Sequence, residues 1–201
     1  MKTNKTIFLI FALLLVSLFS FAQEHKSLTK FITFEEAVAA AKKNPKPILI
    51  DIYTQWCGPC KMMTKNTFGD EKVAKYLNDN FYCVKFDAES FDTVRLEIMV
   101  KDTLRENGKV VKIQDKPFTV KFANPSPVGT PRSPHQFASS ILDGKLQYPS
   151  LVFLSPSIQR LEIKPGYHTP SQFEPIIKFY GSGAYLKQSY EEFNKTFKPE
   201  F

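Results

Sequence analysis

The chain has 201 residues, a length that suits one domain with an added segment. Hydrophobic residues make up 43% of it, including 19 phenylalanines, so a substantial core is expected, whereas three cysteines are too few for a small disulfide-held scaffold. The net charge is +7, but the lysines are spread without a basic run or interleaved aromatics, which favours a solvated surface over nucleic-acid binding.

Residues 1–22 have the pattern of a secretory signal peptide. Lys2 and Lys5 form a charged start, Ile7 to Val16 form the apolar stretch, and small residues predict cleavage after Ala22. The apolar stretch is shorter than the ~20 residues that a membrane span needs. We therefore expect a periplasmic or secreted protein with no stable membrane insertion after cleavage. An uncleaved membrane anchor is the alternative.

Helix-capping and helix-ending residues divide the next part of the chain into alternating predicted helices and strands. The apolar runs 47–53 and 81–87 are typical of strands. The expected helices are one that begins in a capping box at Thr33 and ends at Asn44-Pro45, one over 57–68, and a short one capped by Asp70. This alternation indicates parallel strand pairing with helices on both faces of a sheet.

The stretch Trp56-Cys57-Gly58-Pro59-Cys60 lies at a turn from strand to helix. Unpaired N–H groups at a helix N-terminus favour a thiolate, so we expect the pKa of Cys57 to fall below about 8.5. Cys60, one turn further, can only meet Cys57. A metal would need two more ligands, and neither Cys83 nor the scattered histidines have ligand spacing, so redox chemistry is favoured over zinc or haem. A purely structural disulfide is the other alternative.

Asp51 is a single acid within the apolar run 47–53. Burial would raise its pKa, because the charged form of a carboxyl is desolvated. Such a group could take the proton from Cys60 when that thiol attacks. The alternative is an exposed acid on an edge strand.

Residues 88–133 exceed what a single connecting helix needs, and we expect an insertion there, ahead of a helix that ends at Asp143-Gly144. Its expected parts are a helix over 91–100, a hairpin turn at Asn107-Gly108, a strand over 118–122 and a proline-rich loop over 124–134. Beyond it we expect an antiparallel strand pair over 149–154 and 159–163, a helix from Thr169-Pro170 to Gly181, and one further helix over 184–197.

Trp56-Cys57-Gly58-Pro59-Cys60 is the active-site sequence of the thioredoxin family, which the chain resembles over residues 33–100 and 134–182. The resemblance implies an α/β thioredoxin-like fold with a central mixed β-sheet flanked by helices. Residues 23–201 would form this domain, with an insertion over 88–133 before the cis-proline strand and a C-terminal helical extension over 184–201. The extended form is similar to periplasmic thioredoxin-like proteins of Gram-negative bacteria.

The resemblance also implies roles for individual residues. Cys57 would be the attacking thiolate, Cys60 the resolving thiol, and Lys85 the partner of the buried acid Asp51. The implied substrate-binding residues are Trp56, Tyr148, Pro149 and Gly166, with Trp56 as a shield over the disulfide and the Tyr148-Pro149 bond cis. No metal and no cofactor beyond the redox-active Cys57–Cys60 disulfide is implied.

The expected function is that of a secreted thiol–disulfide oxidoreductase that reduces or isomerises protein disulfides. The Gly58-Pro59 dipeptide resembles that of reducing members of the family more than that of oxidising ones. The implied partners are disulfide-containing proteins and a membrane electron-donor protein. Two alternatives stay open: a chaperone-like module that binds cysteine-containing clients without turnover, and a maturation factor dedicated to one client such as apocytochrome c, with residues 88–133 setting the choice.

Overall fold

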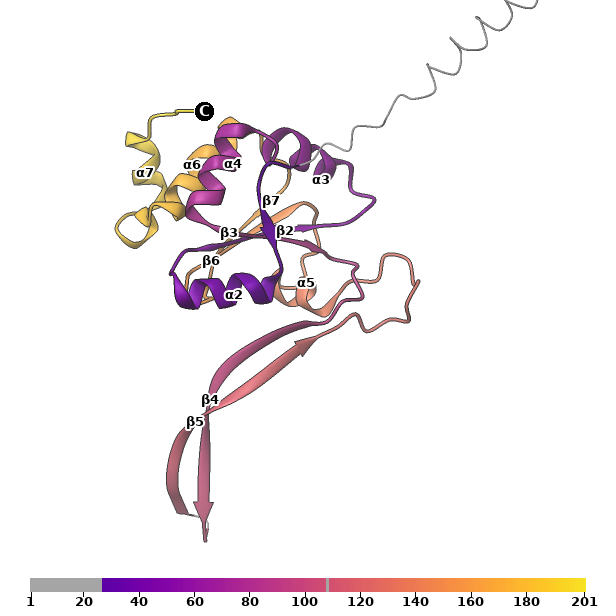
Figure 1. Cartoon of the computed structure of the whole chain (residues 1–201), viewed down its shortest axis with the longest axis vertical. Coiled ribbons are helices and arrows are strands. Elements are labelled where there is room, and N and C mark those ends of the chain that lie inside the picture. Colours follow the sequence, from indigo (N-terminus) through magenta and orange to yellow (C-terminus); the bar gives the residue numbers. More distant parts are fainter. Residues whose placement is uncertain (1–26, 108) are drawn as a thin grey trace, which may run out of the picture.

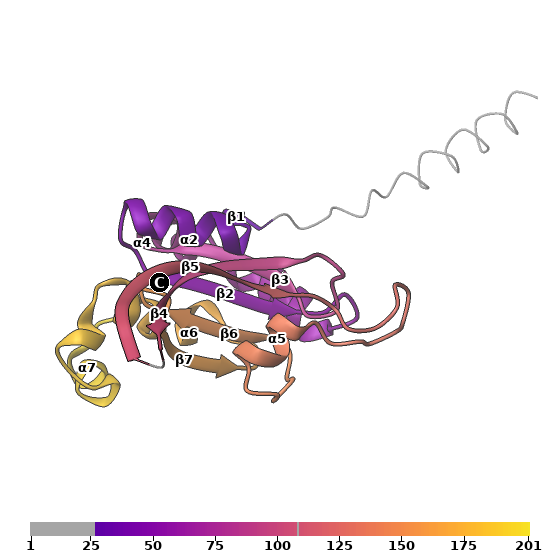
Figure 2. The same cartoon turned by 90° about the horizontal axis from the view of Figure 1, so that it is seen from below.

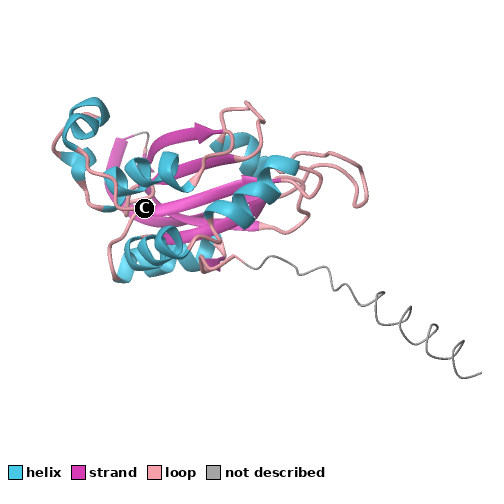
Figure 3. Cartoon of the chain, turned by 90° about the horizontal axis from the view of Figure 1, so that it is seen from above, coloured by secondary structure: helices cyan, strands magenta, loops and turns pink. Residues whose placement is uncertain are grey.

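A five-stranded mixed sheet forms the centre of the computed structural model, which describes residues 27–107 and 109–201. The predicted signal peptide lies outside these residues. Helices cover both faces of the sheet, and a two-stranded hairpin projects from it (Figures 1 and 3). The strands are β1 (Phe31–Ile32), β2 (Ile48–Tyr53), β3 (Tyr82–Asp87), β4 (Val94–Glu106), β5 (Lys109–Phe122), β6 (Ser150–Leu154) and β7 (Arg160–Pro165).

The helices are short and most begin at an explicit cap. They are α2 (Phe34–Lys43), α3 (Gly58–Met62), the π-helix η1 (Met63–Thr67), α4 (Glu71–Asn80), α5 (Gln136–Ile141), α6 (Pro170–Gly181), the 3₁₀-helix η2 (Ala184–Leu186) and α7 (Tyr190–Thr196). The capping box predicted at Thr33 is present: its Oγ1 accepts the Glu36 N–H at 3.2 Å, and Glu36 Oε2 accepts the Thr33 N–H at 2.8 Å. Asp70 caps α4 as predicted.

The sheet order β1-β3-β2-β6-β7 places β2 at the centre, parallel to β3 and antiparallel to β6. Because β2 is covered on both faces, its sequence is nearly continuously apolar. Ile48, Ile50 and Ile52 pack with α2 and α5, whereas Leu49 packs on the opposite face with residues of η1, α4 and α6. Asp51 shares that second face by strand alternation. The predicted mixed α/β fold is confirmed.

The helix predicted over residues 91–100 is wrong, because residues 94–100 belong to strand β4 and residues 91–93 lead into it. Apolar residues recur there at every second position, at Val94, Leu96, Ile98 and Val100, which is the strand period. β4 pairs antiparallel with β5 from Val94 opposite Phe122 to Glu106 opposite Lys109. The predicted hairpin is therefore confirmed by the pairing of Glu106 with Lys109, whereas Gly108 of the predicted turn lies outside the described residues. The hairpin is far longer than expected (Figures 1 and 2).

The single helix predicted over residues 184–197 is also wrong in part. The chain forms η2 and then α7, separated by Ser189 in an extended conformation. Ser189 accepts the Glu192 N–H at 3.3 Å, which starts a new capped helix instead of continuing the first. The C-terminal extension therefore consists of two short helices.

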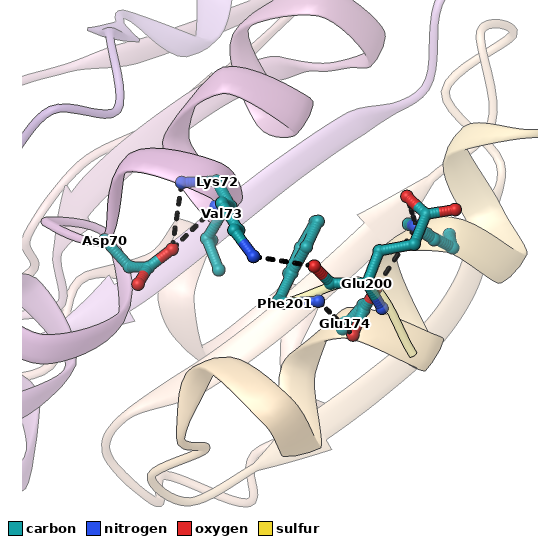
Figure 4. Close-up of polar contacts among 7 residues, drawn as sticks. Asp70, Lys72, Val73, Glu174, Glu200 and Phe201 are labelled. Carbon is teal, nitrogen blue, oxygen red and sulfur yellow. Dashed lines mark hydrogen bonds and ion pairs between the residues drawn. The ribbon is translucent and has the colours of Figure 1, made fainter. Parts of the chain in front are cut away.

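A buried carboxylate holds the last residues of the chain against α6. Glu174 is fully buried and accepts backbone N–H groups from Glu200 at 2.7 Å and from Phe201 at 3.1 Å (Figure 4). Lys178, one turn further along α6, lies 3.1 Å from the same carboxylate. Lys72 of α4 donates to the Glu200 carbonyl at 2.8 Å, so this contact joins α4, α6 and the C-terminal segment.

We expect Glu174→Ala to lower the free energy of unfolding by about 3 kcal/mol, because two backbone donors lose a charged acceptor. Urea denaturation monitored by circular dichroism measures the change. Glu174→Gln keeps one acceptor oxygen and should cost less, whereas Glu97→Gln on the exposed surface of β4 should cost almost nothing. A loss for Glu174→Ala no larger than that for Glu97→Gln would contradict the assigned role.

Candidate functional site

Cys57 and Cys60 form a disulfide at the start of α3. Cys57 is the N-cap of that helix, and its Sγ accepts the Cys60 N–H at 3.1 Å. A hydrogen bond to sulfur favours the thiolate over the thiol once the disulfide is reduced. The local structure follows from the sequence, since Gly58 and Pro59 fill the first helical positions, where a missing N–H costs nothing.

The disulfide is almost completely covered, with Cys57 3% and Cys60 2% exposed. Trp56, next to Cys57, is by contrast 53% exposed. Cys57 is therefore less open than its place at a strand-to-helix turn led us to expect. Trp56 is thus the exposed neighbour, in sequence, of a buried disulfide.

Three side chains hold or contact the Trp56 ring. Its Nε1 donates to both carboxylate oxygens of Glu89, at 3.0 and 3.1 Å. The Tyr148 ring meets it edge-on, with 6.1 Å between the centroids. The Arg132 guanidinium carbon lies 5.2 Å from the ring centroid. The structure thus joins the predicted residues Trp56 and Tyr148, and it adds Glu89 and Arg132, which the sequence analysis missed.

Pro149, which follows Tyr148 in the chain, lies next to Gly166. The Tyr148–Pro149 peptide bond is cis, as predicted. Gly166 donates its N–H to the Pro149 carbonyl at 2.8 Å and has φ = +91°, a conformation that favours glycine. Pro149 and Gly166 are therefore joined to each other directly, and Tyr148 connects them to Trp56.

Asp51, in the central strand β2, is completely buried. Neither of its carboxylate oxygens has a hydrogen-bond partner in the part of the chain that the structure describes. Burial raises the pKa of Asp51 to about 7, and the positive charge of Lys85 partly opposes this rise. The carboxyl can therefore exchange a proton near neutral pH, as a general base requires.

The predicted partnership of Lys85 with Asp51 is not a direct contact. The two residues are aligned across β2 and β3, yet no ion pair joins them among residues 27–107 and 109–201. The long Lys85 side chain instead donates to Thr64 Oγ1 of η1 at 2.7 Å and lies 4.9 Å from the centre of the Tyr53 ring. Lys85 acts on Asp51 only through its charge.

A cavity of about 540 Å³ borders Cys60, Thr54 and Lys85. It offers solvent a path to the neighbourhood of Cys60. The third cysteine, Cys83, is buried, which raises the pKa of its thiol. A buried neutral thiol is a poor nucleophile, so Cys83 takes no part in the arrangement.

Comparison with known proteins identifies the family of the chain. A sequence model of the family described as thioredoxin-like matches residues 29–156. A thioredoxin-like protein of Synechocystis sp. is 32% identical over 72 residues, which are 36% of this chain and 63% of that protein. Thioredoxin Y, chloroplastic, of Oryza sativa is 31% identical over 83 residues, 39% of this chain and 46% of the rice protein.

A third relative is the thiol:disulfide interchange protein DsbD of Escherichia coli, 38% identical over 58 residues, which are 28% of this chain and 10% of DsbD. The chain thus matches less than two thirds of the length of each of these relatives. Among solved structures, a thioredoxin-fold protein from Helicobacter pylori has a TM-score of 0.48 and 15% identity, with coverage of 80% of this chain and 91% of that chain.

Proposed function

Because the chain belongs to the thioredoxin-like family, we propose that it is an exported thiol–disulfide oxidoreductase that reduces or isomerises disulfides in client proteins. The proposal is carried by the hydrogen bond from the Cys60 N–H to Cys57 Sγ at the start of α3, which favours an attacking thiolate at Cys57. The buried Asp51, with a pKa of about 7, supports it as the proton acceptor for Cys60.

The reaction would proceed in two exchanges. The Cys57 thiolate attacks a client disulfide, so that a Cys57–client bond forms, the client disulfide breaks, and one client thiolate leaves. Cys60 then gives its proton to Asp51 and attacks Cys57 Sγ, which forms the Cys57–Cys60 disulfide and releases the second client thiolate. Two electrons pass to the client, and a membrane dithiol protein would reduce the Cys57–Cys60 disulfide again.

Reduction rather than oxidation is proposed because the Gly58-Pro59 dipeptide resembles that of reducing relatives. Export rests on the predicted signal peptide, and the mass of the processed protein would test cleavage after Ala22. In the part of the chain that the structure describes, no helix is both long and apolar enough to cross a membrane.

Reduction of insulin by dithiothreitol tests the catalytic function. We expect the protein to accelerate the precipitation of the insulin B chain well above the rate with dithiothreitol alone, because the Cys57–Cys60 pair relays electrons. An unchanged precipitation rate combined with stable capture of reduced insulin would favour the client-binding alternative. An unchanged rate with insulin, together with rapid reduction of one native client, would favour the dedicated maturation factor.

A further inference from the structure

The loop over residues 124–134 belongs to the insertion and brings Arg132 to the Trp56 ring. Hydrogen bonds join the two ends of this loop. Asn124 Nδ2 donates to the Ser133 carbonyl at 2.9 Å, and Asn124 Oδ1 accepts from Ser133 Oγ at 2.8 Å. The buried His135 then anchors the exit of the loop, with its N–H on the Ala88 carbonyl at 2.7 Å. In Figures 1 and 2 the loop lies on the same side of the molecule as the turn into α3.

Arg132, whose side chain lies against the Trp56 ring, has an unusual backbone conformation. Its φ is +54°, in the left-handed region that residues other than glycine rarely adopt. Such a conformation persists only where the surroundings impose it, and it is enriched at functional sites. The guanidinium carbon lies 5.2 Å from the centroid of the ring of Trp56, the residue that precedes Cys57 in the chain.

Glu89 and Arg132 are charged residues that contact Trp56, and Glu89 bonds to Trp56, which leaves the Arg132 guanidinium available to a ligand. Both Glu89 oxygens accept the Trp56 N–H. Arg132 is exposed, and none of the hydrogen bonds or ion pairs formed among residues 27–107 and 109–201 involves its guanidinium. A guanidinium stacked on an aromatic ring keeps its N–H donors in a fixed plane, and that planar fork matches a carboxylate.

On the basis of the function proposed above, we propose that Arg132 is a specificity-determining residue that binds a carboxylate beside the reacting cysteine of the client. The client is therefore a polypeptide with an acidic side chain next to its disulfide. Trp56 orients the guanidinium, and Tyr148 forms the opposite wall of the approach. The inserted segment would thus select the client, while the cysteine pair performs the exchange.

The test uses three peptides that contain the same disulfide and differ only in the residue beside one cysteine: glutamate, glutamine or lysine. For the wild-type protein we expect kcat/KM to be about fivefold higher for the glutamate peptide than for the lysine peptide, the size of an exposed ion pair. The preference should shrink as salt is added. Arg132→Gln should bring the ratio to about one.

Two further variants separate charge from stacking. Arg132→Lys keeps the charge but not the planar fork, so it should retain only part of the preference. Lys43→Gln makes the same change of charge at the exposed last residue of α2 and should leave the ratio as in the wild type. Equal rates on all three peptides for the wild type, or a preference that survives Arg132→Gln, would overturn the assignment while the oxidoreductase function stands. Failure of the wild type to reduce any peptide would overturn that function and this inference together.

Discussion

Cys57→Ala is expected to reduce the rate of insulin reduction to that of dithiothreitol alone. The thiolate is the nucleophile in disulfide exchange, and Cys57 is the cysteine at the helix N-cap whose sulfur accepts the Cys60 N–H. Cys83 cannot replace it, because burial raises the pKa of its thiol. The turbidity assay measures the loss. Catalysis retained by Cys57→Ala would show that the assigned nucleophile is wrong.

Cys60→Ala should fail differently, because Cys57 can still attack while nothing releases the client. A Cys57–client disulfide should therefore accumulate and appear on a non-reducing gel as a band that dithiothreitol removes. Cys83→Ala is the matched control: it removes a buried thiol that takes no part in exchange, so it should trap no client. Equal amounts of trapped client in the two variants would refute the distinction between Cys57 and Cys60.

Asp51 is expected to make the folded protein less stable as the pH rises from 4 to 8. Well below pH 3.8 the carboxyl is protonated in both states, so its ionisation does not alter the stability. Between pH 3.8 and 7 the unfolded chain loses the proton while the folded protein keeps it, so stability falls, and above pH 7 the cost is constant. A pKa raised from 3.8 to about 7 corresponds to a cost of about 4 kcal/mol.

The stability gained by Asp51→Asn should therefore be about 3–4 kcal/mol greater at pH 8 than at pH 4. Comparing the two pH values cancels any cost of burying the amide. Urea unfolding of both proteins at each pH measures the difference, and Asp115→Asn, at an exposed position of β5, serves as the control with no such dependence. A gain that is the same at both pH values would mean that the Asp51 carboxyl titrates normally.

Local signals determined how much of this structure could be predicted. The caps at Thr33, Asp70 and Thr169 act over three or four residues, so the sequence located the starts of α2, α4 and α6 well. The alternating pattern of residues 94–100 is equally local, but the helix predicted over 91–100 assumed the helical period instead of the strand period of two. The two short helices after Gly183 depended on a cap at Ser189 that the apolar pattern of the segment concealed.

The contacts of the site depended on geometry that no local pattern carries. Alignment of Asp51 with Lys85 followed from parallel pairing of β2 with β3, but the turn of the Lys85 side chain to Thr64 depends on where η1 lies. Arg132 meets Trp56 from within a long loop whose ends are held by hydrogen bonds of Asn124 and His135. Such a contact has no signature in sequence spacing.

Trp56 is the only tryptophan in the chain, and it lies between Glu89, Arg132 and the Tyr148 ring beside the disulfide. The intrinsic fluorescence of the protein in the ultraviolet therefore comes largely from a single ring, on the residue that precedes Cys57 in the chain. Opening or closing the Cys57–Cys60 bond, or docking a client on Arg132, changes the immediate surroundings of that ring. The molecule thus carries its own optical probe, and stopped-flow measurements can follow each half of the exchange without a dye.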